Sequence, residues 1–130
     1  MVSESSANNS IGWRITIGVH VGYSADTKEP VEEQKLIRIY RRAAEAAEAV
    51  NGVYISAVLW PSRVIYKTEW GCPEEGEFTY TFVGNCNPAF SDPETYRKAL
   101  LDLTENLKRE LQQSTVLLEL FPSEVYYLKD

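Results

Sequence analysis

The chain has 130 residues, of which 44% are hydrophobic and 25% charged, as is usual for one globular domain. Its net charge of −6 argues against general nucleic-acid binding, because a phosphate backbone attracts Lys and Arg and repels Asp and Glu. No stretch approaches the ~20 apolar residues of a membrane span, and residues 1–10 lack the basic start and apolar run of a signal peptide. We therefore expect a disordered polar tail at 1–10, one domain over 11–130 and a cytoplasmic location.

Residues 13–23 alternate between apolar and small or polar side chains. Successive strand side chains point to opposite faces, so this pattern predicts a strand with one face in the core. The other face carries Arg14, Thr16 and His20, the only histidine of the chain. The predicted core face consists of Trp13, Ile15, Ile17, Val19, Val21 and Tyr23.

A helix is predicted from Pro30, which suits a first helical turn, to about Val50, before the stop signal Asn51-Gly52. Its basic residues alternate with glutamates and indicate a solvated outer face. Its predicted buried stripe consists of Leu36, Tyr40, Ala43, Ala47 and Val50.

Two extended segments follow, 53–60 and 63–70, and Pro61 predicts a bend between them because proline removes a ladder donor. A Gly-, Pro- and charge-rich turn at 71–77 leads into a returning strand at 78–83. Cys72 lies in this turn and Cys86 beyond the far end of the returning strand, so no disulfide is predicted.

The second helix starts with Asp92 as N-cap and Pro93 at the first position, or with a capping box from Ser91 to Glu94. It is predicted to end near Gln113. A strand follows at 115–121, Pro122 interrupts it, and 125–128 form a further extended piece. Its predicted apolar stripe consists of Tyr96, Leu100, Leu103, Leu107 and Leu111.

The resulting order, βαββαβ, predicts a two-layer α+β sandwich, an antiparallel sheet with two helices on one face. This layout resembles the ferredoxin-like fold along nearly the whole chain. The resemblance is one of topology, and the fold hosts many unrelated functions, so it implies none of them here.

The helix-free sheet face is the candidate binding surface. We expect it to combine Arg14, His20, Tyr54, Ser56 and Trp60, and large aromatics mixed with a few polar groups are typical of an interface or a ligand groove.

Catalysis finds little support in the residue pattern. His20 is the default general acid/base because its unperturbed pKa lies near neutrality, but no motif supplies its orienting partner. A nucleophilic Ser56 would need the same histidine, and nothing marks Cys86 as reactive. The glycines at 18 and 22 match no phosphate-binding spacing, and the two cysteines match no metal-binding spacing, so no cofactor or metal is expected.

The leading interpretation is a small, soluble, non-catalytic binding domain that self-associates through the helix-free face, most simply as a homodimer. One alternative is a dimeric, barrel-like protein or enzyme that encloses a small molecule, with His20 in the cavity. The other is an acidic protein that binds or inhibits a basic macromolecule. Neither nucleic acid nor membrane is an expected partner.

Overall fold

The computed structural model describes residues 7–19 and 31–128. Its elements follow in the order β1 (Ala7–Gly18), α1 (Glu33–Asn51), β2 (Val58–Val64), the short 3-10 helix η1 (Thr68–Trp70), β3 (Glu77–Asn85), α2 (Pro93–Glu110) and β4 (Leu117–Tyr126).

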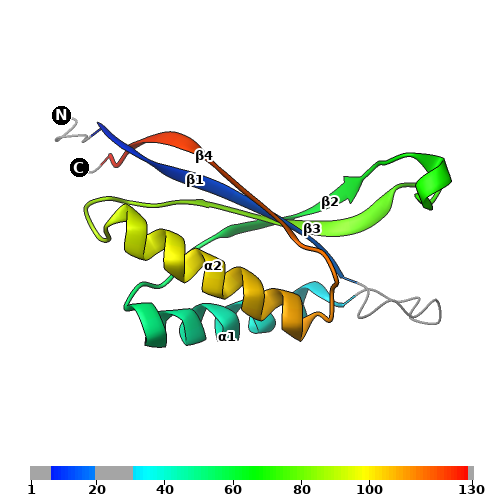
Figure 1. Cartoon of the computed structure of the whole chain (residues 1–130), viewed down its shortest axis with the longest axis horizontal. Coiled ribbons are helices and arrows are strands. Elements are labelled where there is room, and N and C mark those ends of the chain that lie inside the picture. The colour runs from blue at the N-terminus through cyan, green and yellow to red at the C-terminus, as the bar shows by residue number, and fades with distance from the viewer. Residues whose placement is uncertain (1–6, 20–30, 129–130) are drawn as a thin grey trace.

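One four-stranded sheet has the order β2-β3-β1-β4, and all neighbouring strands are antiparallel. Both helices lie on the same face of this sheet, while the β2–β3 hairpin extends beyond the helices (Figure 1). The structure therefore confirms the predicted two-layer α+β sandwich of the ferredoxin-like type.

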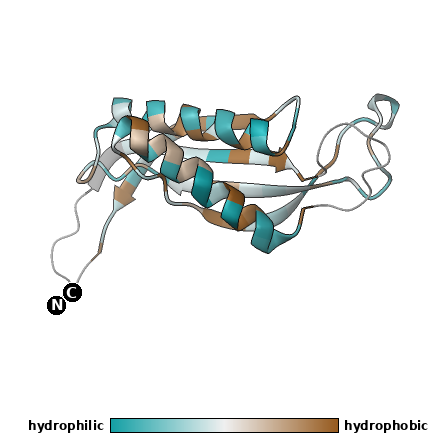
Figure 2. Cartoon of the chain, turned by 90° about the horizontal axis from the view of Figure 1, so that it is seen from below, coloured by the Kyte–Doolittle hydropathy of each residue, from teal (hydrophilic) through white to brown (hydrophobic). Residues whose placement is uncertain are grey.

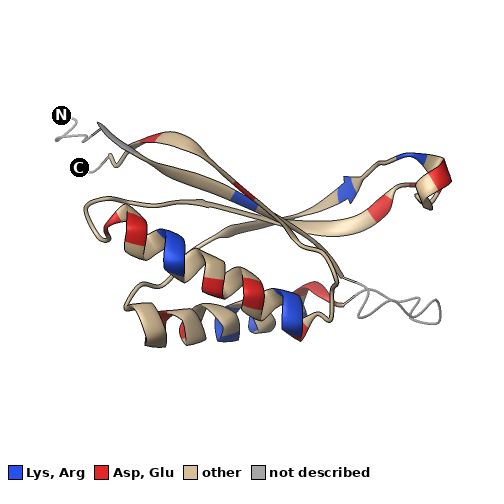
Figure 3. Cartoon of the chain, viewed as in Figure 1, with Lys and Arg blue, Asp and Glu red and all other residues tan. Residues whose placement is uncertain are grey.

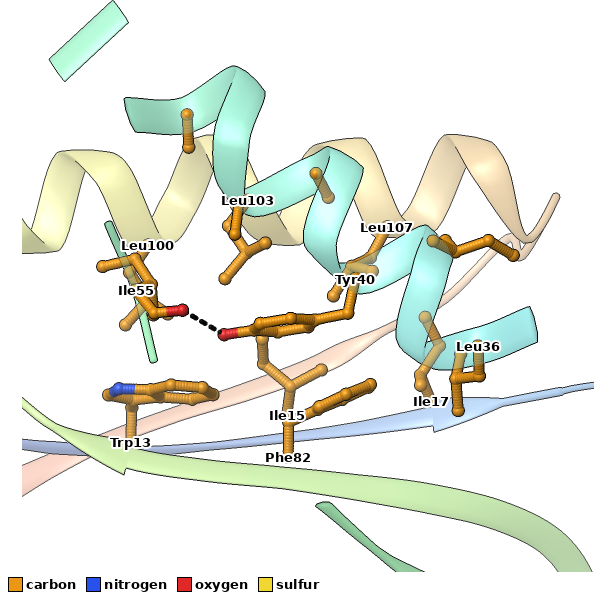
Figure 4. Packing of buried hydrophobic residues seen from close by; sticks show 14 of the residues in the cluster. Trp13, Ile15, Ile17, Leu36, Tyr40, Ile55, Phe82, Leu100, Leu103 and Leu107 are labelled. Atoms are coloured by element: carbon orange, nitrogen blue, oxygen red, sulfur yellow. Dashed lines mark hydrogen bonds between the residues drawn. The ribbon is translucent and has the colours of Figure 1, made fainter. Parts of the chain in front are cut away.

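The core lies between the helices and one face of β1, as the alternation predicts. Trp13, Ile15, Ile17 and Val19 are at most 1% exposed, and the aliphatic residues of α1 and α2 pack over them (Figure 4). Seen from the helix side, both helices alternate hydrophilic with hydrophobic residues (Figure 2). One member of the predicted stripes differs: Val50 is 72% exposed, because it lies in the last turn of α1.

Two tyrosine hydroxyls tie the layers together inside this core. The Trp13 indole N–H donates to Tyr96 Oη at 2.8 Å, joining β1 to α2. The Tyr40 hydroxyl donates to the Ile55 carbonyl at 2.7 Å, joining α1 to the segment before β2. Buried polar groups are costly unless they are hydrogen-bonded, so each contact fixes the relative position of two elements.

The helix ends follow the predicted capping chemistry. Gly52 after α1 has φ 75°, a left-handed conformation that suits glycine. The Asp92 side chain accepts from the backbone N–H groups of Glu94 and Thr95, so the Asp92–Pro93 start is the correct one of the two alternatives.

The strand boundaries require several corrections. Residues 53–57 are not a strand, and β2 runs through Pro61 without a bend, just as β4 runs through Pro122. Both are edge strands, where alternate N–H groups point to solvent, so a proline removes no necessary ladder bond. The predicted strand at 63–70 ends at Val64, and η1 replaces its second half.

The amino-terminal strand also starts earlier than expected. β1 begins at Ala7, inside the segment 1–10 that we expected to be a tail, because β4 offers backbone partners as far as Tyr126. Backbone pairing does not require apolar side chains. At its other end the described strand stops at Gly18, and residues 20–23 of the predicted strand lie outside the described residues.

Two further expectations concern the cysteines and the membrane. Cys72 and Cys86 are both free, as predicted. Within the described ranges, neither helix combines the length and the apolarity needed to cross a bilayer.

We predict that Tyr96→Phe lowers the free energy of unfolding by about 1–3 kcal/mol, because it leaves the buried Trp13 N–H without an acceptor. Urea denaturation measures this change. Tyr126→Phe is the matched control, since Tyr126 is 56% exposed and water replaces its hydrogen-bond partner. Equal losses in the two variants would contradict the prediction.

Candidate active site

Arg14 lies on the helix-free face, as expected, but Glu119 of β4 occupies its guanidinium. Arg14 Nε lies 2.8 Å from Glu119 Oε1, and Arg14 Nη2 lies 3.0 Å from Oε2. This hydrogen-bonded pairing raises the pKa of Arg14 and lowers that of Glu119. An anionic ligand at Arg14 would therefore compete with a bidentate carboxylate.

The other residues expected on this face lie at different places in the structure. Trp60 lies opposite Thr81, which in turn lies opposite Thr16, so the indole shares the helix-free face with Arg14. Tyr54 and Ser56 precede β2 and line a cavity of about 360 Å³ beside Tyr40 of α1, at the edge of the helix layer. They do not share a surface with Trp60. His20 lies outside the described residues.

A carboxylate–phenol pair lies at the loop end of the β2–β3 hairpin. Glu77 is the first residue of β3, Tyr66 follows the end of β2, and the Tyr66 hydroxyl donates to Glu77 Oε1 at 3.2 Å. Partial burial and then the Glu77 carboxylate raise the pKa of Tyr66. Glu77 forms no ion pair with a Lys or Arg of the described residues, so its negative charge is available to a ligand.

Gly18 lets other groups approach this pair on the helix-free face. A Cβ at Gly18 would lie 3.2 Å from Glu77 Oε2 and 2.7 Å from Gln113 Oε1. The Glu77 carboxylate and the Gln113 amide therefore converge over the end of β1. Because Gly18 lacks a side chain, these two polar groups pack directly over the backbone of β1.

Hydroxyl groups lie next to Gly18 on the same sheet face, along β2 and β3. Ser62 Oγ lies 2.8 Å from Thr79 Oγ1 and 2.8 Å from Thr81 Oγ1, and Thr79 lies directly opposite Gly18. Both threonines are buried although no helix covers them. These three hydroxyl groups are thus held in place by hydrogen bonds to one another.

A cavity of about 430 Å³ opens beside the pair and is lined by Tyr66 and Glu77 with Arg63, Gly76 and Phe78. Elsewhere the charged residues concentrate on the helices and at the hairpin tip (Figure 3). Arg63 already lies over the Phe78 ring, with its guanidinium carbon 5.4 Å from the ring centre. In this lining the Glu77 carboxylate, held by the Tyr66 phenol, is therefore the group suited to a positively charged part of a ligand.

Neither residue of this pair stands out in the sequence as a candidate. Glu77 was assigned to the charged turn 71–77, and Tyr66 to a continuing strand. One signal was available for Glu77: it continues the alternation of Thr79 and Thr81, opposite the apolar Phe78 and Tyr80. No sequence signal places the Tyr66 hydroxyl on Glu77, because the chain leaves the ladder there.

Comparison with known proteins identifies a family. A family model described as SAM lyase matches residues 8–129. No curated protein sequence matches significantly.

Two solved structures share the fold. A phage SAM lyase in complex with S-methyl-5′-thioadenosine aligns with a TM-score of 0.58 at 15% identity, covering 91% of this chain and 90% of that one. A phage SAM lyase in the apo state aligns with a TM-score of 0.57 at 12% identity, covering 94% and 91%.

These matches overturn the functional part of the sequence analysis. A lyase is an enzyme, so the expectation of a non-catalytic protein-binding domain is wrong, as is the preference against catalysis. A catalytic site was expected only around His20, and the hydrogen bond between Tyr66 and Glu77 forms only in the folded chain.

We predict that Glu77→Gln lowers the pKa of Tyr66, because a neighbouring negative charge opposes phenolate formation and the amide removes it. The effect of burial remains, so the pKa stays above its ordinary value. NMR titration of tyrosine labelled with ¹³C at Cζ measures the shift. Glu75→Gln, in the exposed turn, is the control, and a Tyr66 pKa that is the same in Glu77→Gln as in the wild type would refute the contact.

Proposed function

The chain belongs to the SAM lyase family, and from this premise we propose that it cleaves S-adenosylmethionine (SAM) and releases S-methyl-5′-thioadenosine. The ligand in the related phage structure supports this choice of product. Within the chain itself, the observation that carries the proposal is the Tyr66–Glu77 pair beside the cavity of the β2–β3 hairpin.

The chemistry of the substrate explains why so few side chains of the protein are enough for the reaction. The sulfur of SAM is a sulfonium, so when its bond to Cγ of the methionine part breaks, the electron pair returns to sulfur and a neutral thioether leaves. The α-carboxylate of the same molecule can form the new bond to Cγ and close a five-membered lactone. This step needs neither water nor an external proton donor, and the enzyme's task is orientation.

Glu77 contributes most if it binds a group of the substrate whose charge stays the same throughout the reaction. The positive charge on sulfur decreases towards the transition state and is gone in the product, so a carboxylate against the sulfur would stabilise the substrate more than the transition state. The α-ammonium group stays charged throughout. We assign Glu77 to this ammonium group and Tyr66 to holding the carboxylate that binds it, which turns the α-carboxylate of the substrate towards Cγ.

A second route would use Glu77 differently. As a general base it could remove a β-proton, and elimination would give 2-aminobut-3-enoate and the same thioether. The absence of a cation partner for Glu77 among the described residues is compatible with this role. ¹H NMR of the fresh products distinguishes the routes, since only elimination creates vinyl protons.

We predict that the purified chain converts SAM to S-methyl-5′-thioadenosine without another reagent. Glu77→Gln lowers kcat/KM by about 100-fold, because the α-ammonium group loses its charged partner and the α-carboxylate is no longer held towards Cγ. Chromatography of the nucleoside product measures the rate, and Glu75→Gln keeps it. An inactive wild type would refute the reaction, while full activity of Glu77→Gln would refute only the site.

The remaining sequence-based expectations stay proposals. His20, which follows Gly18 by two positions in the sequence, is retained as a ligand-contact candidate together with Arg14, Tyr54, Ser56 and Trp60. His20→Ala in the same assay tests it. The cytoplasmic location also stays a prediction.

We further propose that copies of the chain pack through the helix-free face, as the sequence analysis expected for a dimer. This face exposes apolar side chains on both edge strands: Val58 and Trp60 on β2, and Leu117 and Phe121 on β4, each between 42% and 56% exposed. Exposed apolar groups of this size commonly mark contact surfaces.

Accordingly, Trp60→Glu is expected to lower the molar mass in light scattering to that of one chain, because it places a charge in the contact. Trp70→Glu, at the 74% exposed hairpin position, is the matched control and keeps the wild-type mass. A wild type that is monomeric at high micromolar concentration would refute self-association.

A further inference from the structure

Tyr66 reaches Glu77 only because the chain leaves the β2–β3 ladder. The ladder ends with Val64 opposite Glu77, and its continuation would place Tyr66 opposite Glu75, two positions further into the turn. Instead, residues 65–67 connect β2 to η1 without strand pairing, and the Tyr66 hydroxyl turns back to Glu77. The sheet therefore does not determine the position of this side chain.

The backbone N–H of Tyr66, released from the ladder, is bonded by a cysteine. Cys72 Sγ accepts it at 3.4 Å. The thiol itself is within donor distance of two carbonyls, 3.4 Å from that of Pro73 and 4.0 Å from that of Val64. A partly buried N–H needs a partner, and within the described chain Cys72 is the one that Tyr66 has.

The turn holds Cys72 in place for this contact. Gly71 has φ 96°, and its N–H donates to the Thr68 carbonyl at 2.9 Å, which reverses the chain after η1. The N–H of Gly76 donates to the Pro73 carbonyl at 2.9 Å. The sulfur is thus fixed from both sides while it holds the Tyr66 backbone.

From these contacts, and on the basis of the proposed function, we infer that Cys72 is a positioning residue that holds the Tyr66 backbone so that the phenol meets Glu77. Cys72 does not act on the substrate, and its effect on turnover passes through Tyr66.

The two cysteines allow this role to be tested in the folded protein. Cys72 is partly exposed, whereas Cys86 is fully buried, and its Sγ lies 3.7 Å from both the Ser91 carbonyl and the Ser91 hydroxyl. Iodoacetamide should therefore react first at Cys72. In that reaction the thiolate sulfur forms a bond to the CH2 carbon, iodide leaves and the thiol proton passes to the buffer.

The decisive experiment is a double-mutant cycle on SAM cleavage by the full chain. Cys72→Ala should lower kcat by about 10-fold with little change in KM, because a displaced orienting group costs rate rather than binding. In a Tyr66→Phe background the same substitution should have no further effect. Cys72→Ser, which keeps a polar atom, should restore part of the rate.

Other outcomes of the cycle overturn the inference. Equal losses from Cys72→Ala in the wild type and in Tyr66→Phe would mean a general structural role. Unchanged activity in Cys72→Ala would mean that the contact has no consequence for turnover. Alkylation provides a check on protein that is already folded, so a variant that fails to fold cannot affect the result. One carbamidomethyl group on Cys72, located by peptide mass, should lower kcat as the alanine substitution does. An unchanged kcat would contradict the inference.

A third measurement separates this inference from the proposed function. Glu77→Gln should lower the Tyr66 pKa less in a Cys72→Ala background than in the wild type, because in that background the Tyr66 phenol no longer contacts residue 77. This NMR result does not depend on turnover. If the chain does not cleave SAM, the proposed function fails while the titration still decides the role of Cys72, and equal shifts in the two backgrounds would refute that role.

Discussion

The register of β1 between β3 and β4 is the constraint on which the rest of the structure depends. Trp13 lies opposite Gly84 and Leu120, and a shift of one residue would turn the whole core face of β1 to solvent. The burial of Trp13 under α2, with its N–H bonded to Tyr96, fixes this register. The same register sets Gly18 opposite Thr79, so the packing of the core determines that a glycine lies beneath the Glu77 carboxylate.

Most of the fold could be predicted from the sequence because side-chain periodicity reports burial. The alternation on β1 and the stripe from Tyr96 to Leu111 depend on the core alone; the stripe is correct, and so is the alternation from Trp13 to Val19, where the described part of the segment ends. The edge strands were harder to predict, since a proline such as Pro61 or Pro122 interrupts a strand only where the strand must form hydrogen bonds with a neighbour on each side. At Pro61 the sequence does not reveal whether the strand lies at an edge or in the middle of the sheet.

The candidate site could not be predicted for a different reason. A search for acid/base partners around the only histidine assumes a reaction that moves protons. In the proposed reaction the sulfonium of the substrate carries the charge that drives cleavage, so a carboxylate and a phenol that orient the substrate would be enough, without a proton-transfer pair. Tyr66 and Glu77 are ordinary in the sequence, and their relation arises from a turn that departs from the hairpin ladder. Arg14, which the pattern placed on the candidate binding surface, is bonded to Glu119.

The two edge prolines have a consequence for how copies of this sheet can assemble. Each outer strand, β2 and β4, contains one residue without an N–H, yet each keeps its ladder with its inner neighbour. An incoming strand that added to either rim would find an interrupted row of donors, which opposes open-ended growth of the sheet into fibres. Association through faces can close on itself at a finite number of copies. The prolines thus leave the catalyst free to form closed assemblies while they disfavour filaments.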